Sequence, residues 1–380
     1  MFNLGIDITP LTTPERTGVG EYTYQLLSAL FDIDTQNQYF LFYNSFRDVD
    51  AHIPKWKNKN VTYIKTGYPN KLFHTSVQLF GFPRKDILIE KREKIKLDYF
   101  FSPNLSFHAL SKNTKHILTM HDLSFEIFPE CFSPKMRLWH TLLSPKKQCK
   151  KAENILTPSQ NTKRDIEDLY GIDAQKIQVL TPGLDSSFCN RVIDESQQKK
   201  MQEKYTLPEK YILFLGTIEP RKNIEGVIAA FELFQKKCGQ EYKLVIAGGS
   251  GWKNTKILRV IEKNKNVQYI GYVQNKHKAG LYSGARLFVY PSLYEGFGFP
   301  ILEAMACSVP VITSNRSSLP EIAGDAAYFV NPYNTAEMAL GMERILMDKE
   351  VSNFFIQKGK EHIEKFQWKK TAEQFLSFLV

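Results

Sequence analysis

Short apolar runs rich in β-branched and aromatic residues alternate with helical patterns along the whole chain. This alternation predicts βαβ units and parallel sheets, and therefore an α/β fold. Loops at the carboxyl ends of the strands are where such sheets bind ligands. We expect strands near residues 2–8, 39–43, 61–64, 99–102, 117–120, 155–157 and 177–180, and again near residues 211–215, 244–247, 267–270, 287–290, 310–313 and 327–330.

The chain divides at a polar stretch, residues 185–208, after which the alternation starts again. With 380 residues it exceeds what one hydrophobic core usually serves. We therefore expect two Rossmann-like domains, residues 1–185 and residues 186–365. The last segment, residues 366–380, has the pattern of an amphipathic helix, which could pack back on the first domain.

The composition is that of a folded protein and leaves its partners open. Apolar residues make up 43% of the chain and charged residues 24%, and no apolar run is long enough to span a bilayer, so we expect a cytoplasmic protein. The five cysteines are scattered without the spacing of a zinc site or a disulfide framework, which suits a reducing compartment and favours no metal site. The formal net charge of +10 is compatible with nucleic acid, an anionic membrane or phosphorylated substrates.

The strongest candidate site is a glycine-bearing loop that joins the eleventh expected strand to a helix. Gly296 and Gly298 allow a tight turn, and we expect the helix to begin at Pro300 with its free amides directed at a diphosphate. Glu295 in the loop and Glu303 in the expected first turn could accept hydrogen bonds from sugar and ribose hydroxyls. The plainer alternative is a turn in which Glu303 is favoured only by the helix dipole.

A second candidate loop leaves the first strand of the second domain. It opens with Gly216 and Thr217 and presents the adjacent cations Arg221 and Lys222 before a helix. These cations suit a leaving diphosphate, because arginine offers a bidentate fork and lysine a point charge. A solvated surface pair is the alternative reading.

The first domain carries further candidates directly after expected strands. Gly18 and Gly20 form a Gly-x-Gly turn between the first strand and a helical run. His121 and Asp122 follow the fifth expected strand, although a single histidine is more often structural than functional. Ser159 is expected to cap the amino terminus of a helix.

A basic amphipathic helix is expected at residues 135–151, with a break near Pro145. It carries six cations and no acidic residue, and its apolar side chains include Leu138, Trp139 and Leu142. One reading is a packed helix with a solvated basic face. The other is a face that rests on an anionic membrane carrying a lipid-linked acceptor.

Together these motifs resemble those of the family-four retaining glycosyltransferases, whose mark is two glutamates separated by seven residues, as Glu295 and Glu303 are here. The resemblance covers essentially the whole chain. It implies the GT-B fold, in which two Rossmann-like domains face each other across a cleft. Residues 1–185 would then form the acceptor side, and residues 186–365 would bind the nucleotide sugar.

The resemblance also implies roles for individual residues. Glu303 would hold the donor ribose, while Glu295 and His121 would face the donor sugar. Many relatives carry an arginine where this chain has Thr217, which leaves Arg221 to supply the fork for the diphosphate. The implied catalytic residues are His121, Glu295, Arg221 and Lys222, and the implied donor-binding residues are Gly18, Gly20, Asp122, Gly216, Thr217, Phe297, Gly298, Phe299 and Glu303.

The implied activity is sugar transfer from a nucleotide diphosphate donor to a glycan or lipid-linked acceptor in surface polysaccharide synthesis, such as that of lipopolysaccharide. Anomeric configuration would be retained, and no metal or other cofactor is expected because no Asp-x-Asp motif occurs in the candidate loops. The motifs are similar to those of a mannosyltransferase branch, so GDP-mannose is the first expectation for the donor. The protein would be cytoplasmic, with possible peripheral contact at the inner face of the plasma membrane.

Three alternatives stay open at this point. UDP-sugar-dependent glycosyltransferases share most of these residues. A sugar-nucleotide epimerase or hydrolase of the same fold would keep the nucleotide contacts and lack an acceptor surface. A non-enzymatic nucleic-acid-binding protein is suggested only by the net charge, and it would need an aromatic and basic groove that the sequence does not show.

Overall fold

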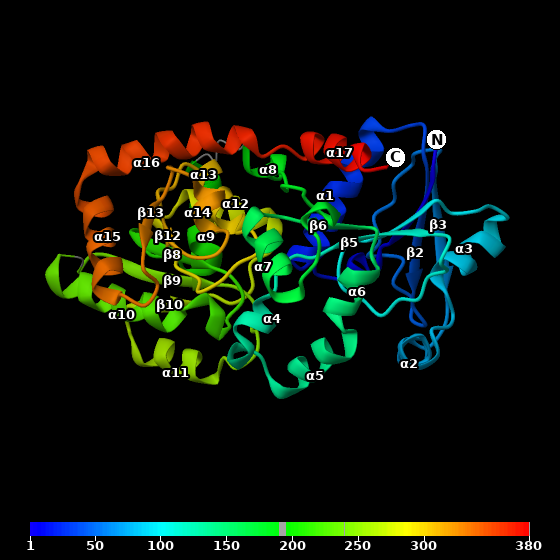
Figure 1. Ribbon diagram of the computed structural model, residues 1–380. Coiled ribbons are helices and arrows are strands. Elements are labelled where there is room, and N and C mark those ends of the chain that lie inside the picture. The colour runs from blue at the N-terminus through cyan, green and yellow to red at the C-terminus, as the bar shows by residue number, and fades with distance from the viewer. Residues whose placement is uncertain (190–194, 239, 380) are drawn as a thin grey trace. The chain divides into compact units, whose positions relative to one another are not determined.

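The computed structural model describes residues 1–189, 195–238 and 240–379, and it contains two parallel sheets in two compact units (Figure 1). Unit 1 consists of Met1–Leu123, Leu138–Gly183 and the segment from Gln367 onward. Unit 2 consists of Ser124–Arg137 and Leu184–Phe366.

The division expected between residues 185 and 186 lies two residues from the point where the chain leaves unit 1. The grouping of Ser124–Arg137 with unit 2 was not expected, because nothing in the local pattern shows which sheet a connecting segment packs on. Part of the polar stretch at 185–208, residues 190–194, lies outside the described residues, as does residue 380 at the end of the last expected helix. The rest of the polar stretch contains two helices, α8 (Ser186–Cys189) and α9 (Glu195–Tyr205).

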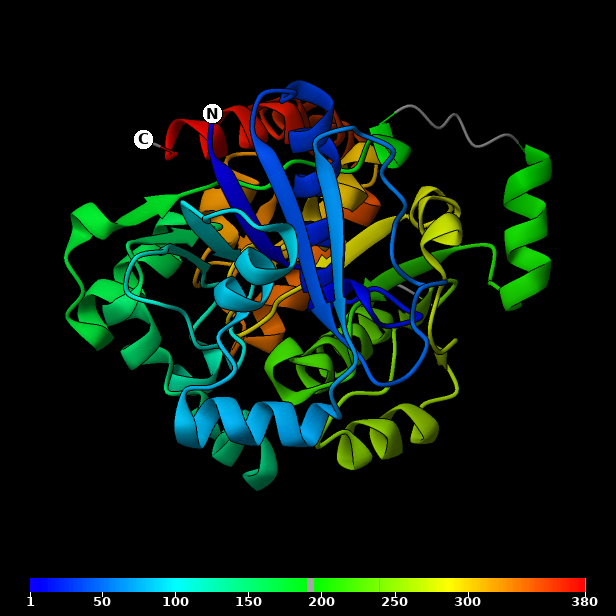
Figure 2. The same ribbon diagram turned by 90° about the vertical axis from the view of Figure 1, so that its right-hand side faces the viewer.

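The sheet of unit 1 has seven parallel strands in the order β3-β2-β1-β4-β5-β6-β7. Figures 1 and 2 show β1, β2 and β3 side by side. The chain reverses its winding between β1 and β4, which places the loops that follow these two strands at a topological switch point. The strands are β1 (Asn3–Asp7), β2 (Gln38–Asn44), β3 (Val61–Thr66), β4 (Tyr99–Ser102), β5 (Lys115–Thr119), β6 (Asn154–Thr157) and β7 (Ile177–Val179).

The helices of unit 1 bury apolar side chains against this sheet; Phe73 and Ile89, for example, join Phe42 and Phe100 in one core cluster. Ser159 caps its helix by accepting a hydrogen bond from the Thr162 amide, as predicted. The helices are η1 (Thr9–Leu11), α1 (Gly18–Ile33), α2 (Asn70–Phe80), α3 (Lys85–Glu93), α6 (Pro145–Lys151), α7 (Gln160–Tyr170), η3 (Ala174–Lys176) and α17 (Trp368–Ser377). A further helix, α5 (Pro134–Leu143), begins in unit 2 and ends in unit 1.

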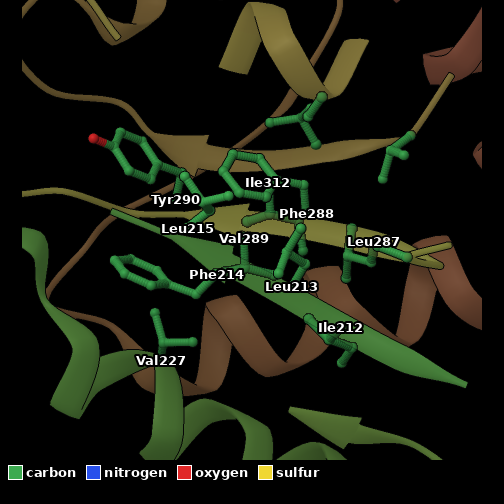
Figure 3. Packing of buried hydrophobic residues seen from close by; sticks show 14 of the residues in the cluster. Ile212, Leu213, Phe214, Leu215, Val227, Leu287, Phe288, Val289, Tyr290 and Ile312 are labelled. Atoms are coloured by element: carbon green, nitrogen blue, oxygen red, sulfur yellow. The ribbon is translucent and has the colours of Figure 1, made fainter. Parts of the chain in front are cut away.

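The sheet of unit 2 has six parallel strands in the order β10-β9-β8-β11-β12-β13, with the same reversal between its first strand, β8, and β11. Apolar residues from both of these strands meet in one core (Figure 3). The strands are β8 (Tyr211–Leu215), β9 (Lys243–Ala247), β10 (Val267–Tyr269), β11 (Leu287–Tyr290), β12 (Val311–Ser314) and β13 (Tyr328–Val330). All thirteen strands of the two sheets lie within two residues of their predicted positions.

The remaining helices of unit 2 complete the βαβ connections. The short helices α4 (Ser124–Ile127) and η2 (Pro129–Cys131) belong to it although they lie early in the chain. The others are η4 (Pro220–Lys222), α10 (Ile224–Lys237), α11 (Thr255–Lys263), α12 (Asn275–Ser283), α13 (Phe299–Ala306), α14 (Leu319–Ala323), α15 (Thr335–Met347), α16 (Lys349–His362) and η5 (Ile363–Lys365).

The C-terminal helix α17 packs on unit 1, against segments that are far from it in the sequence. The Thr371 hydroxyl donates a hydrogen bond to the Thr181 carbonyl at 2.8 Å, and the Phe375 ring lies 4.9 Å from that of Phe101. Gly183 permits this close approach, because a Cβ at this position would lie 2.1 Å from the Trp368 backbone nitrogen.

We expect Gly183→Ala to destabilise the protein by about 2 kcal/mol or more, because α17 must move away to make room for the methyl group. Urea unfolding followed by circular dichroism would measure the loss. Gly67→Ala is the matched control, since a Cβ at Gly67 would have no neighbour within 4 Å. Equal stability of the two variants would contradict this account of the α17 contact.

Candidate active site

The loop after β11 turns sharply into α13. Gly298 has a left-handed backbone with φ of 117°, which favours glycine, and the helix begins at the next residue, Phe299. Pro300 therefore occupies the second helical position rather than the first. For the same reason the prediction that Glu303 lies in the first turn was wrong by a small margin; Glu303 is the fifth residue of the helix and is buried.

The Glu295 carboxylate is the centre of a buried hydrogen-bonded cluster. Its Oε1 accepts from Lys222 Nζ at 2.5 Å and from the Tyr290 hydroxyl at 3.0 Å, while its Oε2 accepts from Arg221 Nη1 at 2.9 Å. Burial alone would raise the pKa of Glu295, but the charges of Arg221 and Lys222 outweigh it and lower this pKa to about 2. The carboxylate is therefore ionised throughout the neutral range.

Arg221 connects the loop after β8 with the loop after β11. Its Nη1 also donates to the Tyr294 carbonyl at 2.5 Å, and its Nη2 donates to Glu219 Oε1 at 2.7 Å. Only 9% of Arg221 and 8% of Lys222 are exposed, so the alternative of a solvated surface pair was wrong. The two cations are instead held inside unit 2 by two carboxylates.

Glu219 was not singled out from the sequence, although it precedes the two cations by only two and three residues. Burial raises the pKa of its carboxyl, and the attraction of Arg221 offsets this only in part. The carboxyl groups of Glu219 and Glu295 are thus the partners of Arg221 and Lys222 inside unit 2. An anionic ligand that reaches this cluster must therefore compete with an internal carboxylate.

Tyr290, the last residue of β11, fixes the position of Lys222. Lys222 Nζ donates to the tyrosine oxygen at 2.6 Å and lies 5.0 Å from the ring centroid. The ring stacks against Phe214, and Figure 3 shows its hydroxyl pointing away from the apolar core. From the sequence Tyr290 was only the end of an apolar run, and no local signal distinguishes it from an ordinary core aromatic residue.

Glu303 belongs to a second polar group. Its Oε2 accepts a hydrogen bond from the buried Tyr282 hydroxyl at 2.8 Å, and its Oε1 lies 3.7 Å from Lys278 Nζ. Both partners come from α12, which the sequence did not connect with α13. The tyrosine hydroxyl orients the carboxylate, and the lysine partly balances its charge.

The backbone of the loop is supported from the segment before α14. The Ser318 hydroxyl lies 2.9 Å from the carbonyl oxygens of both Glu295 and Phe297, and the Glu295 amide donates to Ser317 Oγ at 2.9 Å. The Phe297 and Phe299 rings pack edge to face with centroids 4.8 Å apart. These contacts fix the backbone that carries the candidate amides of Phe297, Gly298 and Phe299.

The loop after β8 also depends on close backbone contact. Gly248 follows β9, and a Cβ there would lie 1.9 Å from the Gly216 carbonyl oxygen. Thr217, where the resemblance led us to expect an arginine, is exposed, and its methyl group lies against Gly251. Thr217 thus adds no charge to the site.

In unit 1, His121 lies just beyond β5. Its Nε2 is 2.8 Å from the Pro103 carbonyl oxygen, so this nitrogen donates and the neutral ring carries its lone pair on Nδ1. Burial lowers the pKa of His121, which favours the neutral ring at pH 7. The ring packs edge-on against Tyr22 with centroids 4.8 Å apart, while Asp122 is partly exposed next to it in the chain.

Gly18 and Gly20 were expected in a loop, but they form the first turn of α1. Thr17 caps this helix by accepting from the Gly20 amide at 3.3 Å, which favours an earlier start of the helix than the glycines suggested. A Cβ at Gly20 would lie 3.0 Å from the Pro10 carbonyl oxygen, so close packing is what this glycine permits. Gly18 remains exposed at the helix terminus.

The predicted site residues thus fall into three groups. Arg221, Lys222 and Glu295 are brought together in unit 2, and Glu303 lies in the same unit with different partners. His121 lies in unit 1, as do Asp122 and the two glycines of α1. Among the residues that the structure describes, no group of three or more His, Cys, Asp or Glu side chains is arranged to hold a metal ion.

Two family models match the chain. Residues 16–188 match the model for Glycosyltransferase Family 4, and residues 196–362 match that for Glycosyl transferases group 1. O-antigen chain mannosyltransferase B of Escherichia coli is 30% identical over 378 residues, which is 95% of each chain. The chain belongs to glycosyltransferase family four. This glycosyltransferase is also 30% identical, over 59% of each chain, to O-antigen chain mannosyltransferase RfbU of Salmonella typhimurium.

The fold of the glycosyltransferase is GT-B, as its likeness to solved structures shows. Sucrose-phosphate synthase from Thermosynechococcus elongatus superposes with a TM-score of 0.75 at 19% identity, covering 100% of this chain and 98% of the other. WaaG, a glycosyltransferase involved in lipopolysaccharide biosynthesis, gives a TM-score of 0.70 at 14% identity, with 98% of each chain covered. Identities this low establish the fold alone.

We expect Arg221→Met to destabilise the protein by about 3 kcal/mol or more, because it leaves the buried carboxylates of Glu219 and Glu295 without a shared cation. Urea unfolding at pH 7 would measure the change. Arg259→Met, at an exposed position of α11, serves as the control and should change the stability by less than about 0.5 kcal/mol. Equal losses in the two variants would show that the cluster does not hold the two loops together.

Proposed function

We propose that this glycosyltransferase is a retaining mannosyltransferase that moves mannose from GDP-mannose to a glycan or lipid-linked acceptor in surface polysaccharide synthesis. The observation that carries the proposal is the buried cluster of Glu295 with Lys222 and Arg221 at the carboxyl ends of two adjacent strands. Mannose is favoured because the relative that covers 95% of the chain is an O-antigen chain mannosyltransferase. A UDP-sugar is the alternative donor.

The donor nucleoside and diphosphate would be held around α13. Glu303 would accept hydrogen bonds from the ribose hydroxyls through Oε1, because Oε2 already accepts one from Tyr282. Lys278, which lies 3.7 Å from Oε1, would lower the free-energy cost of burying the carboxylate charge. Backbone amides at the start of α13, those of Phe297, Gly298 and Phe299, would donate to the sugar and the diphosphate. In this arrangement the Glu303 carboxylate binds the ribose hydroxyls, and the backbone amides bind the diphosphate.

An exchange of ion pairs would accompany donor binding. The diphosphate would replace the Glu295 carboxylate on Lys222, and Glu295 would turn its released oxygen to a hydroxyl of the donor sugar. Arg221 would remain attached to Glu219, or give up one of its contacts to reach the diphosphate as a fork. The diphosphate would add negative charge beside Glu219 and Glu295, and the amides at the start of α13 would offset part of this cost.

The transfer itself would need no metal ion, because Lys222, Arg221 and the α13 amides can neutralise the departing diphosphate. Among the described residues, we assign no carboxylate the role of a covalent nucleophile. We therefore propose displacement on the same face, in which the leaving phosphate helps to deprotonate the acceptor hydroxyl. His121 would accept a hydrogen bond from a donor hydroxyl through Nδ1, which its bond to Pro103 leaves as the acceptor nitrogen.

The acceptor would bind to unit 1. A cavity of about 490 Å³ lies there at the carboxyl ends of β1 and β2, and its lining includes Thr9, Asn44, Asn70 and His74. Such hydroxyl, amide and imidazole groups suit a ligand rich in hydroxyls. The buried Lys85 also lines this cavity and is paired with Asp7 at 2.6 Å, a contact that the sequence did not reveal.

A peripheral position at the inner face of the plasma membrane would bring the enzyme to a lipid-linked acceptor. A membrane-spanning helix is absent from the described residues. The predicted basic helix is two helices, α5 and α6, broken at Ser144 next to Pro145, and its side chains Leu138, Trp139 and Leu142 are exposed. We propose that the basic face of these helices rests on an anionic membrane.

Glu303→Ala and Lys222→Ala should each reduce transfer by about a hundredfold or more, because each removes a contact to the donor. Radiolabelled product formed from GDP-mannose would be measured under single-turnover conditions with a membrane fraction as the source of acceptor. Lys263→Ala, an exposed lysine of α11, should leave the rate unchanged. Wild-type turnover of both site variants would rule out the assigned donor site.

The donor can be identified by thermal shift against GDP-, UDP-, ADP- and dTDP-sugars. We expect GDP-mannose to raise the melting temperature most, because a ligand that binds only the folded state stabilises it. Incubation with GDP-mannose alone, followed by product analysis, separates transfer from the alternatives. Rapid formation of free sugar or of an epimer without any acceptor would favour a hydrolase or an epimerase. If only UDP-sugars raised the melting temperature, the donor would be a UDP-sugar and the proposal of GDP-mannose would be wrong.

A further inference from the structure

Unit 1 contains a second, larger cavity that the proposed transfer reaction does not use. Its volume is about 900 Å³, and it lies between the end of α2, the loop after β4 and the start of α6. A volume of this size accommodates a small organic ligand or a lipid headgroup. Its charged lining residues are Arg84, Lys112, Lys115, Lys147, Lys151 and Glu153.

The positive charge of this cavity is largely unbalanced. Within the described part of the chain, Arg84, Lys112, Lys147 and Lys151 form no ion pair with a carboxylate. Five cations line the cavity together with one carboxylate, so the cavity attracts anions. A phosphate group suits such a site, because lysine and arginine side chains form charge-assisted hydrogen bonds with its oxygens.

The lysines of α6 divide into two faces. Lys147 and Lys151, one helical turn apart, line the cavity, whereas Lys146 and Lys150 do not. All four side chains are exposed. The same helix therefore supplies both a test pair and a matched control pair.

Exposed apolar side chains border the cavity. Gly81 lines it, and its neighbours Phe80 and Phe82 are 78% and 66% exposed. Leu142 at the end of α5 also lines it and is exposed, as is Leu79 on α2. Aromatic and aliphatic groups of this size lie in water only at a cost, so their clustering marks an interaction surface.

The two apolar borders belong to one surface. The Phe107 ring packs on Trp139 of α5 with centroids 6.4 Å apart and on His74 of α2 at 5.7 Å. In Figures 1 and 2, α2 lies at the outer edge of unit 1. The cavity lining thus includes the ends of α2 and α5, both of which carry exposed apolar side chains.

We propose that this surface docks on an anionic phospholipid bilayer, with a lipid phosphate group in the cavity and Phe80, Phe82 and Leu142 inserted at the interface. Membrane-binding surfaces of this kind place their cations at the lipid phosphates. Their aromatic and aliphatic side chains enter the bilayer at the boundary between headgroups and acyl chains. The inference rests on the membrane contact proposed above and extends it from the basic helix face to a specific headgroup site. A soluble phosphorylated ligand would leave the apolar border unexplained.

A second copy of this chain fits the surface less well. A symmetric contact through this face would bring the unpaired cations of one copy against those of the other, and like charges across an interface oppose association. An anionic bilayer instead satisfies both the cations and the apolar border. Charge complementarity therefore favours the membrane.

Flotation of the full-length protein with vesicles tests the proposal. We expect binding to phosphatidylcholine vesicles that contain phosphatidylglycerol and little binding to phosphatidylcholine alone. Lys147→Glu/Lys151→Glu should weaken binding at least about tenfold more than Lys146→Glu/Lys150→Glu, although the change in net charge is the same. Equal losses in the two double variants would overturn the headgroup site while leaving the general contact of the basic helix intact.

The apolar border has its own control. Phe80→Ser should weaken vesicle binding about fivefold, because a ring is lost from the bilayer interface. Phe354→Ser, at an exposed position of α16 in unit 2, should have no effect. If Phe80→Ser instead abolished a concentration-dependent dimer seen by sedimentation, and vesicles did not bind, the surface would be an interface between copies and the proposal would fail.

Stabilisation by GDP-mannose, measured on the same variants, separates this inference from the proposed function. Normal stabilisation with no vesicle binding by the wild-type protein would overturn the membrane surface alone. Binding of inorganic phosphate or glycerol phosphate to the cavity, lost in Lys147→Glu/Lys151→Glu and unaccompanied by vesicle binding, would assign the cavity to a soluble ligand and also overturn it. Vesicle binding without any sugar-nucleotide stabilisation would contradict the donor proposal and leave the docking surface standing.

Discussion

The arrangement of the proposed donor site depends on one carboxylate. Glu295 binds Lys222 through one oxygen and Arg221 through the other, and in doing so it joins the loops that follow β8 and β11. These strands are neighbours at the point where the winding of the sheet reverses. The fold places these two loops side by side, and the buried ion pairs of Glu295 join them. Such pairs are electrostatically stronger inside the protein than in water.

Arg221, and not position 217, supplies the arginine of this cluster. A cation at that position would be exposed, whereas Arg221 lies inside and is bound by Glu219 as well. Two cations and two carboxylates can exist together in a buried site because each has a partner. Tyr290 then sets the position of Lys222, so the geometry of the cation depends on the end of a core strand.

The sequence predicted the sheets well, because parallel strands covered on both faces are near-continuous apolar runs that need no knowledge of tertiary contacts. Local backbone chemistry was predictable for the same reason: Ser159 caps α7, as its position before a polar helical run suggested. Contacts between distant segments were not predictable. Tyr282 donates a hydrogen bond to Glu303, 21 residues further along the chain, and no sequence pattern in either segment predicts this contact. The burial of Arg221 likewise depends on a carboxylate 74 residues away.

The ion-paired cluster and the basic cavity lie in different units of the protein. The ion-paired cluster and Glu303 lie entirely within unit 2, so their geometry is set by one hydrophobic core. The basic cavity and its apolar border lie within unit 1, supported by a separate core cluster. The proposed membrane surface and the ion-paired cluster are therefore supported by different cores, although the donor contact proposed for His121 would come from unit 1.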